Sequence, residues 1–331
     1  MNSSLQQAFL GSLVADAVAM PVHWYYDTQL LDRDYPELND YTAPRNPHAG
    51  SILWRSHYRA RNEKGEILHD QAQYWGQRGI HYHQFLDSGE NTVNYQLAAE
   101  LHRLVVERGA YDADAWLDRY IECLRTPGWH RDTYLEEYHR AFFDNYARGK
   151  KPRDCGIKDI HIGGIATVPA LVAALDVVGT NPTEIPAIVR EHVVLTHQAP
   201  PVDAAALALT RMLLAIADGE DLASSIQSHA TGWIGAAELD RLAMRSDREI
   251  IGRRFSPACY MPESFTASLA LVWKHRDSFS GGILANARCG GDNCHRGAVV
   301  GSLLGGALGI ETKWRDGLKA SIDHFAEASE A

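Results

Sequence analysis

Three glycines spaced four residues apart, Gly297, Gly301 and Gly305, limit more than any other feature how this chain can fold. They lie in and just before an apolar run, Ala298–Ile310, which is typical of a buried helix. In a helix, residues four apart share one face, so this face carries no side chains. Each glycine inside a helix costs roughly 1 kcal/mol relative to alanine. The repeated cost predicts that a second helix packs very close to the bare face.

The segment before this helix is polar and contains two further glycines. It reads Gly290-Gly291-Asp292-Asn293-Cys294-His295. Asp292 or Asn293 can cap the helix, because either side chain accepts hydrogen bonds from N–H groups of the first turn. We favour a central helix whose N-terminal end presents Asp292, Cys294 and His295 to a cleft. The alternative is a core helix with a polar cap and no further role.

Composition narrows the class of protein. The chain has 331 residues, 45% of them hydrophobic, and a net charge of -10, which argues against non-specific nucleic-acid binding. Its five cysteines include no C-x-x-C pair, which favours a reducing cytoplasm over a disulfide framework. The N-terminus lacks a signal-peptide pattern, and the run Ala298–Ile310 is too short to span a bilayer. We expect a cytoplasmic globular protein without membrane or nucleic-acid partners, of unknown oligomeric state.

Periodic apolar residues predict an all-α protein. Residues 5–20 form a first amphipathic helix that ends at Pro21, and its apolar pattern includes a carboxylate, Asp16, for which a structural role is favoured over a place in a site. No run of alternating, β-branched residues indicates a strand. We expect one domain, 1–331, of roughly a dozen helices. The other predicted helices are 88–108, 112–124, 133–148, an apolar helix ending at 178, 183–195, 202–217, 221–229, 234–244, 262–275 and 315–328.

Residues 21–88 have no clear periodicity and are rich in aromatic and histidine side chains. Long irregular segments in compact domains are usually functional. We expect a loop over the cleft whose aromatic rings stack on a ring-shaped or sugar ligand. The alternative is that the rings only anchor the loop. The candidate substrate-binding residues here are His23, Trp24, His81 and His83.

A further histidine lies in the joint Thr196–Pro201, which precedes an alanine-rich helix. His197 could contact substrate. A hydrogen bond from its ring to a backbone carbonyl, holding the turn, is the slightly favoured alternative.

Two polar clusters, each at the start of a helix, are candidates for a metal site. They are Gly89-Glu90-Asn91-Thr92 and the segment 290–295. Hard divalent cations prefer carboxylate, amide and hydroxyl oxygens, which both clusters offer. Cys294 and His295 are softer ligands that suit a transition metal better than magnesium.

At these motifs the chain resembles the ADP-ribosylglycohydrolase family from end to end. The family's first helix, G-x-L-x-G-D-A-x-G-x-P, is similar to Gly11–Pro21, and its T-D-D-T motif is similar to Gly89–Thr92. Its T-H-x-x-P joint resembles Thr196–Pro200, and its G-G-D-T-D-T motif with the following small-residue helix resembles Gly290–Gly309. The resemblance implies an orthogonal all-α bundle with two central magnesium ions that bind ADP-ribose and the attacking water.

The chain departs from the family at most ligand positions. By the resemblance, Glu90 and Asn91 replace two aspartates, Gly89 replaces a threonine, and Asp292 is unchanged. Cys294 replaces the aspartate that bridges the metals, and His295 replaces a threonine ligand. Because a thiolate cannot bridge two hard cations, we expect at most one ion. Magnesium is the family's metal, and manganese, zinc or iron are alternatives.

We therefore expect a hydrolase that cleaves an N- or O-glycosidic bond of an ADP-ribosyl or related ribosyl compound. Three explanations of the altered motifs stay open. One metal of changed identity is held by Glu90, Asn91, Asp292 and His295. Or the site is metal-free, with Cys294 and His295 acting in the chemistry together with Glu90 and Asp292, since a helix N-terminus lowers a thiol pKa. Or the protein is a non-catalytic binding or structural member, like the crystallins of the fold.

Overall fold

The computed structural model describes residues 3–320, and the regular secondary structure in that range consists of helices joined by irregular segments. Its only β pairings are three isolated bridges, so the all-α prediction is confirmed for the described residues. The helices are α1 Ser4–Ala19, α2 Thr28–Asp34, α3 Val93–Arg108, α4 Ala113–Arg125, α5 Glu137–Ala147, α6 Val168–Val177, α7 Ile185–Val194, α8 Pro200–Ala217, α9 Leu222–His229, α10 Ala236–Ala243, α11 Asp247–Ile250, α12 Glu263–Lys274, α13 Phe279–Arg288, α14 Asn293–Leu308 and α15 Thr312–Gly317.

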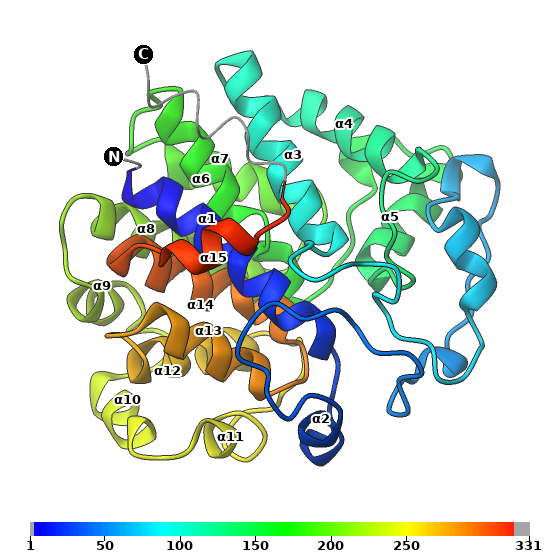
Figure 1. The fold of residues 1–331 in the computed structure, drawn as a ribbon. Helices are drawn as coiled ribbons and strands as arrows, with labels where there is room; N and C mark the ends of the chain where they lie inside the picture. Colours follow the sequence, from blue (N-terminus) through cyan, green and yellow to red (C-terminus); the bar gives the residue numbers. More distant parts are fainter. Residues whose placement is uncertain (1–2, 321–331) are drawn as a thin grey trace.

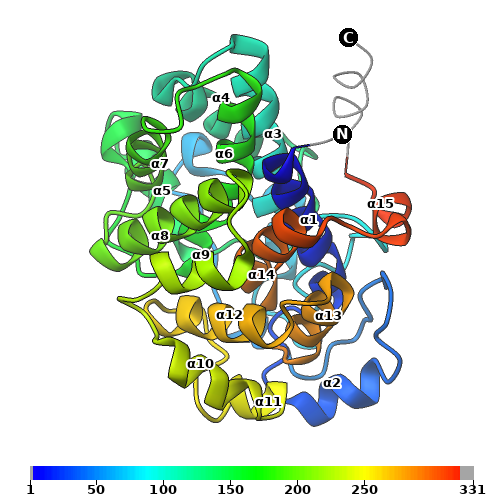
Figure 2. The same ribbon diagram turned by 90° about the vertical axis from the view of Figure 1, so that its left-hand side faces the viewer.

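Helices α1 and α14 form the centre of the molecule. In Figures 1 and 2 they lie against each other, with α3 to α7 on one side and α2 and α10 to α13 on the other. A methyl group added to Gly301 would lie 2.2 Å from the carbonyl oxygen of Gly11 and 2.6 Å from the Cβ of Ala15. A methyl group on Gly305 would lie 2.7 Å from the carbonyl oxygen of Gln7. The predicted close helix contact is confirmed, and α1 is the partner.

One buried apolar cluster extends through the described chain from Leu5 to Leu318. A second, small cluster consists of Trp24, Leu53 and Tyr82, with Trp75 and Tyr134 packed against it. Tyr134 lies outside the segment 21–88, so its contacts with these rings join that segment to the rest of the protein, and ligand contact by the aromatic residues stays a prediction. Within that segment the structure also has α2 and four short 3₁₀ helices, Met20–Val22, Leu53–Arg55, Glu63–Gly65 and His69–Tyr74.

Three helices, α2, α11 and α13, were not predicted, and several predicted boundaries were wrong. Helices α2 and α11 are too short for a periodic pattern to appear, and Gly281 and Gly282 weaken the helical signal of α13. The helix expected at 133–148 begins only at Glu137, because the residues before it are extended. The helix expected at 315–328 corresponds in part to α15, Thr312–Gly317, and its portion from residue 321 lies outside the described residues.

Two helices, Ser4–Val22 and Pro200–Ala217, are long and apolar enough to cross a membrane, and 94% and 50% of their windows are buried. Core helices of globular proteins have the same length and composition, so this observation is weak support for a membrane span.

Candidate active site: a carboxylate–histidine network at the start of α14

The two glycines before α14 bring its N-terminal end against the segment that follows α1. Gly291 N–H donates to the carbonyl of Tyr25 over 2.8 Å, and Trp24 N–H donates to the carbonyl of Gly291 over 2.8 Å. Gly290 and Gly291 both have a φ of 63°, where a side chain is strained. A methyl group on Gly290 would also lie 2.1 Å from the carbonyl oxygen of Tyr25. The sharp backbone approach expected at these glycines is confirmed, and it places His23 beside Asp292.

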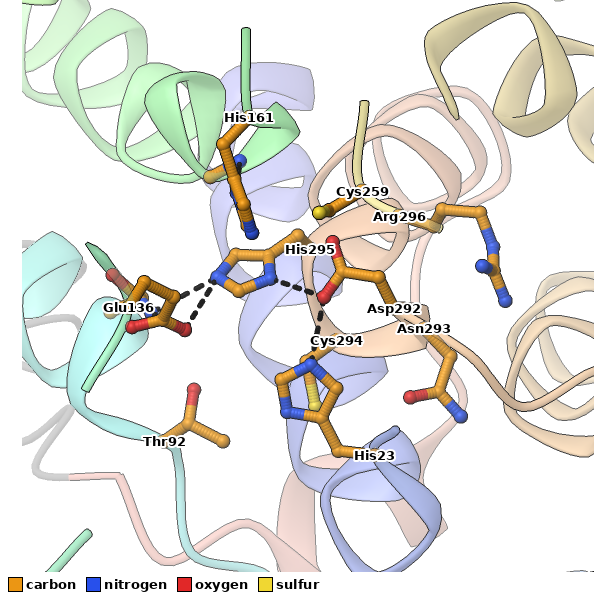
Figure 3. A network of polar contacts seen from close by, with 12 residues as sticks. His23, Thr92, Glu136, His161, Cys259, Asp292, Asn293, Cys294, His295 and Arg296 are labelled. Atoms are coloured by element: carbon orange, nitrogen blue, oxygen red, sulfur yellow. Dashed lines mark hydrogen bonds and ion pairs between the residues drawn. The ribbon is translucent and has the colours of Figure 1, made fainter. Parts of the chain in front are cut away.

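Asp292 holds two histidines on one carboxylate oxygen (Figure 3). Its Oδ1 lies 2.9 Å from Nε2 of His23 and 2.7 Å from Nδ1 of His295. Its Oδ2 is buried and accepts no hydrogen bond from any residue between 3 and 320. Although Asp292 occupies the N-cap position of α14, its side chain does not cap the helix. The capping role expected for Asp292 was therefore wrong, because its carboxylate is directed to the two imidazoles.

The second ring nitrogen of each histidine also has a partner. His295 Nε2 lies 3.2 Å from Oε1 of Glu136 and 3.0 Å from Nδ2 of Asn94. His23 Nδ1 lies 2.8 Å from Nε2 of His83, and His83 Nδ1 is hydrogen-bonded to Asp132. The result is one buried chain of contacts: Asp132, His83, His23, Asp292, His295 and Glu136.

Burial and mutual contact set the charges of this network. Burial by itself would raise the pKa of Asp292, but the charge of His295 and hydrogen bonds from His23 and His295 hold that pKa well below its usual range. Burial would lower the pKa of His295, yet Asp292 and Glu136 raise it to about 10. Burial lowers the pKa of His23 to about 3. The preferred state at neutral pH is therefore two carboxylates on either side of a charged His295, with a neutral His23.

His161 and Cys259 complete the surroundings of Asp292 (Figure 3). His161 precedes the 3₁₀ helix Ile162–Ile165, and its Nδ1 accepts a hydrogen bond from Gly163 N–H over 2.8 Å. The proton of a neutral His161 ring is therefore on Nε2. Two triplets have side-chain atoms close enough to hold an ion: His23, Asp292 and His295, and His161, Cys259 and Asp292.

Arg296 lies near the start of α14 and holds the loop that carries Asp292. It is fully buried and donates to the carbonyls of Pro257 and Gly290 over 3.1 and 2.5 Å. The N–H of Asp292 donates to the same Pro257 carbonyl over 2.9 Å. The Arg296 guanidinium thus holds the loop through backbone carbonyls. It forms no direct ion pair with Asp292 in the described part of the chain.

The first motif, residues 89–92, has a different surrounding from the one expected. The Glu90 carboxylate accepts hydrogen bonds from Arg131 and from Asp87 N–H. It lines a separate cavity of about 340 Å³ together with Arg103, Trp129 and Lys319. The structure therefore does not bring Glu90 together with Asp292, because a cation from elsewhere in the chain neutralises it.

Asn91 and Thr92 hold a buried carboxylate of α1. Asn91 Nδ2 and Thr92 N–H donate to Oδ2 of Asp16, each over 2.8 Å, and Thr92 Oγ1 donates to Oδ1 over 2.8 Å. Burial raises the pKa of Asp16 to about 6 against the effect of these bonds. The structural role favoured for Asp16 agrees with these contacts. The side-chain oxygen of Asn91 is buried and has no hydrogen-bond partner among residues 3–320, so a metal-ligating role for Asn91 stays a prediction.

Cys294 faces away from the network. Its thiol donates to the carbonyl of Asp16 over 3.7 Å, and the residue is fully buried. Burial and the nearby Asp16 charge raise the pKa of this thiol well above its usual value. The lowered pKa expected from the helix N-terminus was wrong, because burial outweighs the helix dipole here.

The candidate substrate-binding residues are buried and contact other protein groups. His81 donates from Nε2 to the carbonyl of Pro21 and accepts at Nδ1 from His83 N–H. His197 Nδ1 lies 2.9 Å from Thr196 Oγ1, so its bond is to a neighbouring hydroxyl. Trp24 belongs to the small aromatic cluster. These placements favour supporting roles, and the substrate roles stay predictions.

Asp132, Glu136, Asn94 and His161 were missed by sequence reasoning. The signal that could have found two of them is the density of ionisable residues in the segment 130–139, where Asp132 and Glu136 stand four apart. Nothing in the local pattern connects that segment with residue 292.

The buried network of carboxylates and histidines at the start of a central helix is a candidate active site, because ionisable groups with shifted pKa values gather at functional sites. The chain is a member of the ADP-ribosylglycohydrolase family, whose sequence profile matches residues 2–330. It thus belongs to a family of glycosyl hydrolases that act on ADP-ribose-type substrates. A solved structure described as an "ADP-ribosylglycohydrolase-related protein complex" is similar over 96% of this chain and 92% of that chain, with a TM-score of 0.62 and 22% identity. That likeness shows the fold. No curated protein sequence matches the chain.

The two-magnesium centre expected from the family does not fit the residues present. Magnesium requires oxygen ligands in near-octahedral geometry. Around Asp292 the other candidate ligand atoms are imidazole nitrogens and the Cys259 thiol, while Glu90 is bonded to Arg131 and the side chains of Asn91 and Thr92 donate to Asp16. The family is generally metal-dependent, and the described residues include candidate metal-ligand groups.

Proposed function

We propose that this protein hydrolyses an N- or O-glycosidic bond of an ADP-ribosyl or related ribosyl compound at a non-standard centre that holds at most one metal ion. The observation that carries the proposal is the position of Asp292. It is the unchanged residue of the family motif, it is fully buried, and its Oδ2 lacks a hydrogen-bond partner among the described residues. A buried carboxylate oxygen without a partner is a rare and costly feature that a substrate or water can satisfy.

The surrounding groups suit glycosidic hydrolysis. This reaction develops positive charge on the sugar ring and needs a base for the attacking water. Asp292 and Glu136 each have one unpartnered buried oxygen within residues 3–320, and both have a pKa held below the usual range by His295. Ionised carboxylates can orient the attacking water and stabilise the charged ring. The Nε2–H of His161 can donate to a substrate oxygen.

Tyr26 is the aromatic residue of segment 21–88 that suits ligand contact best. It is 48% exposed, whereas Trp24, Tyr25 and Tyr82 are buried. Its phenol end is desolvated although the residue as a whole is exposed, and this desolvation, followed by the charge of Asp292, raises the pKa of Tyr26. A ring at this position can stack on a base or sugar while the scissile bond approaches Asp292.

The test is turnover of peptides that carry ADP-ribose on arginine or serine, with release of free ADP-ribose measured by mass spectrometry. We expect release by the native protein, and loss of release in Asp292→Asn. The matched control is Asp32→Asn, which removes an exposed carboxylate paired with Arg248. Circular dichroism establishes that both variants are folded. Equal turnover by Asp292→Asn, or no release from either peptide, contradicts the proposal.

A non-catalytic binding or structural role is the second candidate, and the burial of the network favours it, because a substrate has little access to these side chains. The side chains of His23, Asp292, His295 and Glu136 are 4% exposed or less. Titration calorimetry with ADP-ribose separates the two candidates, because a binding protein takes up ADP-ribose without releasing it from either peptide.

A further inference from the structure

The atoms of His23, Asp292 and His295 converge at one point. His23 Nε2 and His295 Nδ1 lie 2.9 and 2.7 Å from the same Oδ1, and all three ligand atoms are within 4.8 Å of one another. Around an ion with bonds of about 2.0–2.2 Å, ligands at right angles are separated by about 3 Å. Small movements of the three side chains are therefore enough to place an ion between them.

The groups behind the two imidazoles support this use. A histidine that binds a metal through one nitrogen carries its proton on the other, and that N–H usually donates to a carboxylate or another acceptor. His295 Nε2 has Glu136 Oε1 at 3.2 Å. His23 Nδ1 has His83 Nε2 at 2.8 Å, and His83 in turn donates from Nδ1 to Asp132. Both ligands thus have the acceptors that the metal-binding tautomer requires.

The free oxygen of Asp292 gives an independent indication. Oδ2 is buried and unpartnered within the described part of the chain, although Oδ1 accepts two contacts. A buried carboxylate oxygen that faces no donor is an unsatisfied acceptor, and a cation satisfies it.

The other triplet, His161, Cys259 and Asp292, suits a metal less well. His161 Nδ1 already accepts from Gly163 N–H, so the ring presents an N–H at Nε2 in place of a lone pair. His161 therefore acts as a hydrogen-bond donor beside the centre. Its ring meets the ring of His295 edge-on, with centroids 4.9 Å apart.

We propose that His23, Asp292 and His295 form a mononuclear two-histidine, one-carboxylate site for a transition metal of the iron, cobalt and zinc class. This deepens the proposed function by naming the ligand set and the class of metal. Two imidazoles and one carboxylate favour these metals over magnesium. Three protein ligands leave further positions for water and a substrate oxygen.

The test uses the full chain stripped of metal with a chelator and titrated with Co²⁺ alone, without substrate. We expect one Co²⁺ per chain, a visible absorption spectrum, nitrogen couplings from two imidazoles in pulsed electron resonance, and no displacement by millimolar Mg²⁺. His23→Gln is expected to weaken Co²⁺ affinity more than about 100-fold, because loss of a ligand exceeds the cost of losing an outer partner.

Two variants serve as controls. His48→Phe removes another buried histidine, which stacks on Tyr25 and whose ring nitrogens have no hydrogen-bond partner in residues 3–320. We expect this variant to bind Co²⁺ with unchanged affinity. Cys259→Ser tests the alternative triplet, and unchanged affinity is again expected. Two Co²⁺ per chain, no binding, or full affinity in His23→Gln overturns the proposal, as does a large loss in Cys259→Ser. Since binding is measured without substrate, a chain that binds Co²⁺ but does not release ADP-ribose refutes the proposed function and leaves this site intact.

Discussion

The rings of His23 and His83 are nearly coplanar, at 2° to each other, and their Nδ1 and Nε2 atoms lie 2.8 Å apart. Such a contact between two imidazole nitrogens holds one proton. The carboxylate of Asp132 is hydrogen-bonded to Nδ1 of His83, the ring nitrogen that does not contact His23. Asp132 therefore acts on His23 through the His83 ring. Asp132 also accepts from Val93 N–H over 2.7 Å at the start of α3, which keeps it in place.

His83→Gln is predicted to reduce Co²⁺ affinity by about 10- to 100-fold, the usual cost of losing an outer partner of a metal-ligating histidine. The ligands themselves are unchanged, so one ion per chain is still expected. Calorimetry on the metal-free protein measures the change, with His48→Phe as the control. Native affinity in His83→Gln would show that His23 does not depend on the Asp132 contact.

Glu90→Gln is predicted to leave Co²⁺ affinity unchanged, whereas Asp292→Asn is predicted to abolish binding. The reason is that the Glu90 carboxylate is bonded to Arg131 and lines a separate cavity. Parallel titrations of the two variants decide between this arrangement and the sequence-based prediction. An equal loss in both would place Glu90 at the metal when the ion is bound.

Gly301→Ala is predicted to destabilise the protein by about 1–3 kcal/mol or more, because a methyl group there overlaps backbone of α1 and overpacking costs that much. The clash distance of 2.2 Å involves a carbonyl oxygen, which cannot move as a side chain does. Urea unfolding measures the loss. Gly232→Ala is the control, since a methyl group at Gly232 meets no atom within 4 Å. Equal stability of the two variants would mean that the helices can separate at no cost.

Burial raises the pKa of Asp16 from its ordinary value of 3.8 to about 6. We therefore predict that the free energy of unfolding falls as the pH rises through this range. In that window the folded protein keeps a proton that the unfolded chain has lost, so the free energy of unfolding decreases with pH. The total effect is about 3 kcal/mol, at about 1.4 kcal/mol for each unit of pKa shift. Unfolding curves of the native protein and Asp16→Asn across this range measure it. Parallel pH profiles would show that Asp16 has an ordinary pKa.

Cys294 is predicted not to react with iodoacetamide in the folded protein at neutral pH. Its thiol is buried and its pKa is raised, and only the thiolate reacts. Mass spectrometry of labelled peptides, with and without denaturant, is the measurement. Rapid labelling of the native protein, together with loss of activity in Cys294→Ser, would support thiol chemistry instead.

The fold could be predicted from local patterns to a large extent. The spacing of Gly297, Gly301 and Gly305 indicates a close helix contact whatever the partner is, and the motifs around Asp16 and Asp292 identify the family. Short helices such as α2 carry too few residues for a period to appear. Their boundaries depend on packing that no local pattern contains.

The site could be predicted only in part. Asp292 and His295 were identified as candidate site residues from the family motif, and His23 was identified as a substrate-binding candidate of the segment 21–88. The partner of each side chain was not predictable, because it comes from distant sequence. Arg131 neutralises Glu90 from 41 residues away, and Glu136 reaches His295 from a segment without a motif. The pKa of Cys294 was misjudged because a helix terminus is visible in sequence and burial is not.

The contact between His23 and Asp292 joins positions 269 residues apart. During synthesis, α1 emerges early, and the face that packs on the glycines of α14 has no partner until α14 has also left the ribosome. The centre of the molecule and its polar network are therefore completed in the same late event. Contacts of such long sequence separation slow folding, and they expose apolar surface in the meantime. A nascent chain that stalls before Asn293 would leave the apolar face of α1 without its partner helix and exposed to chaperones and proteases.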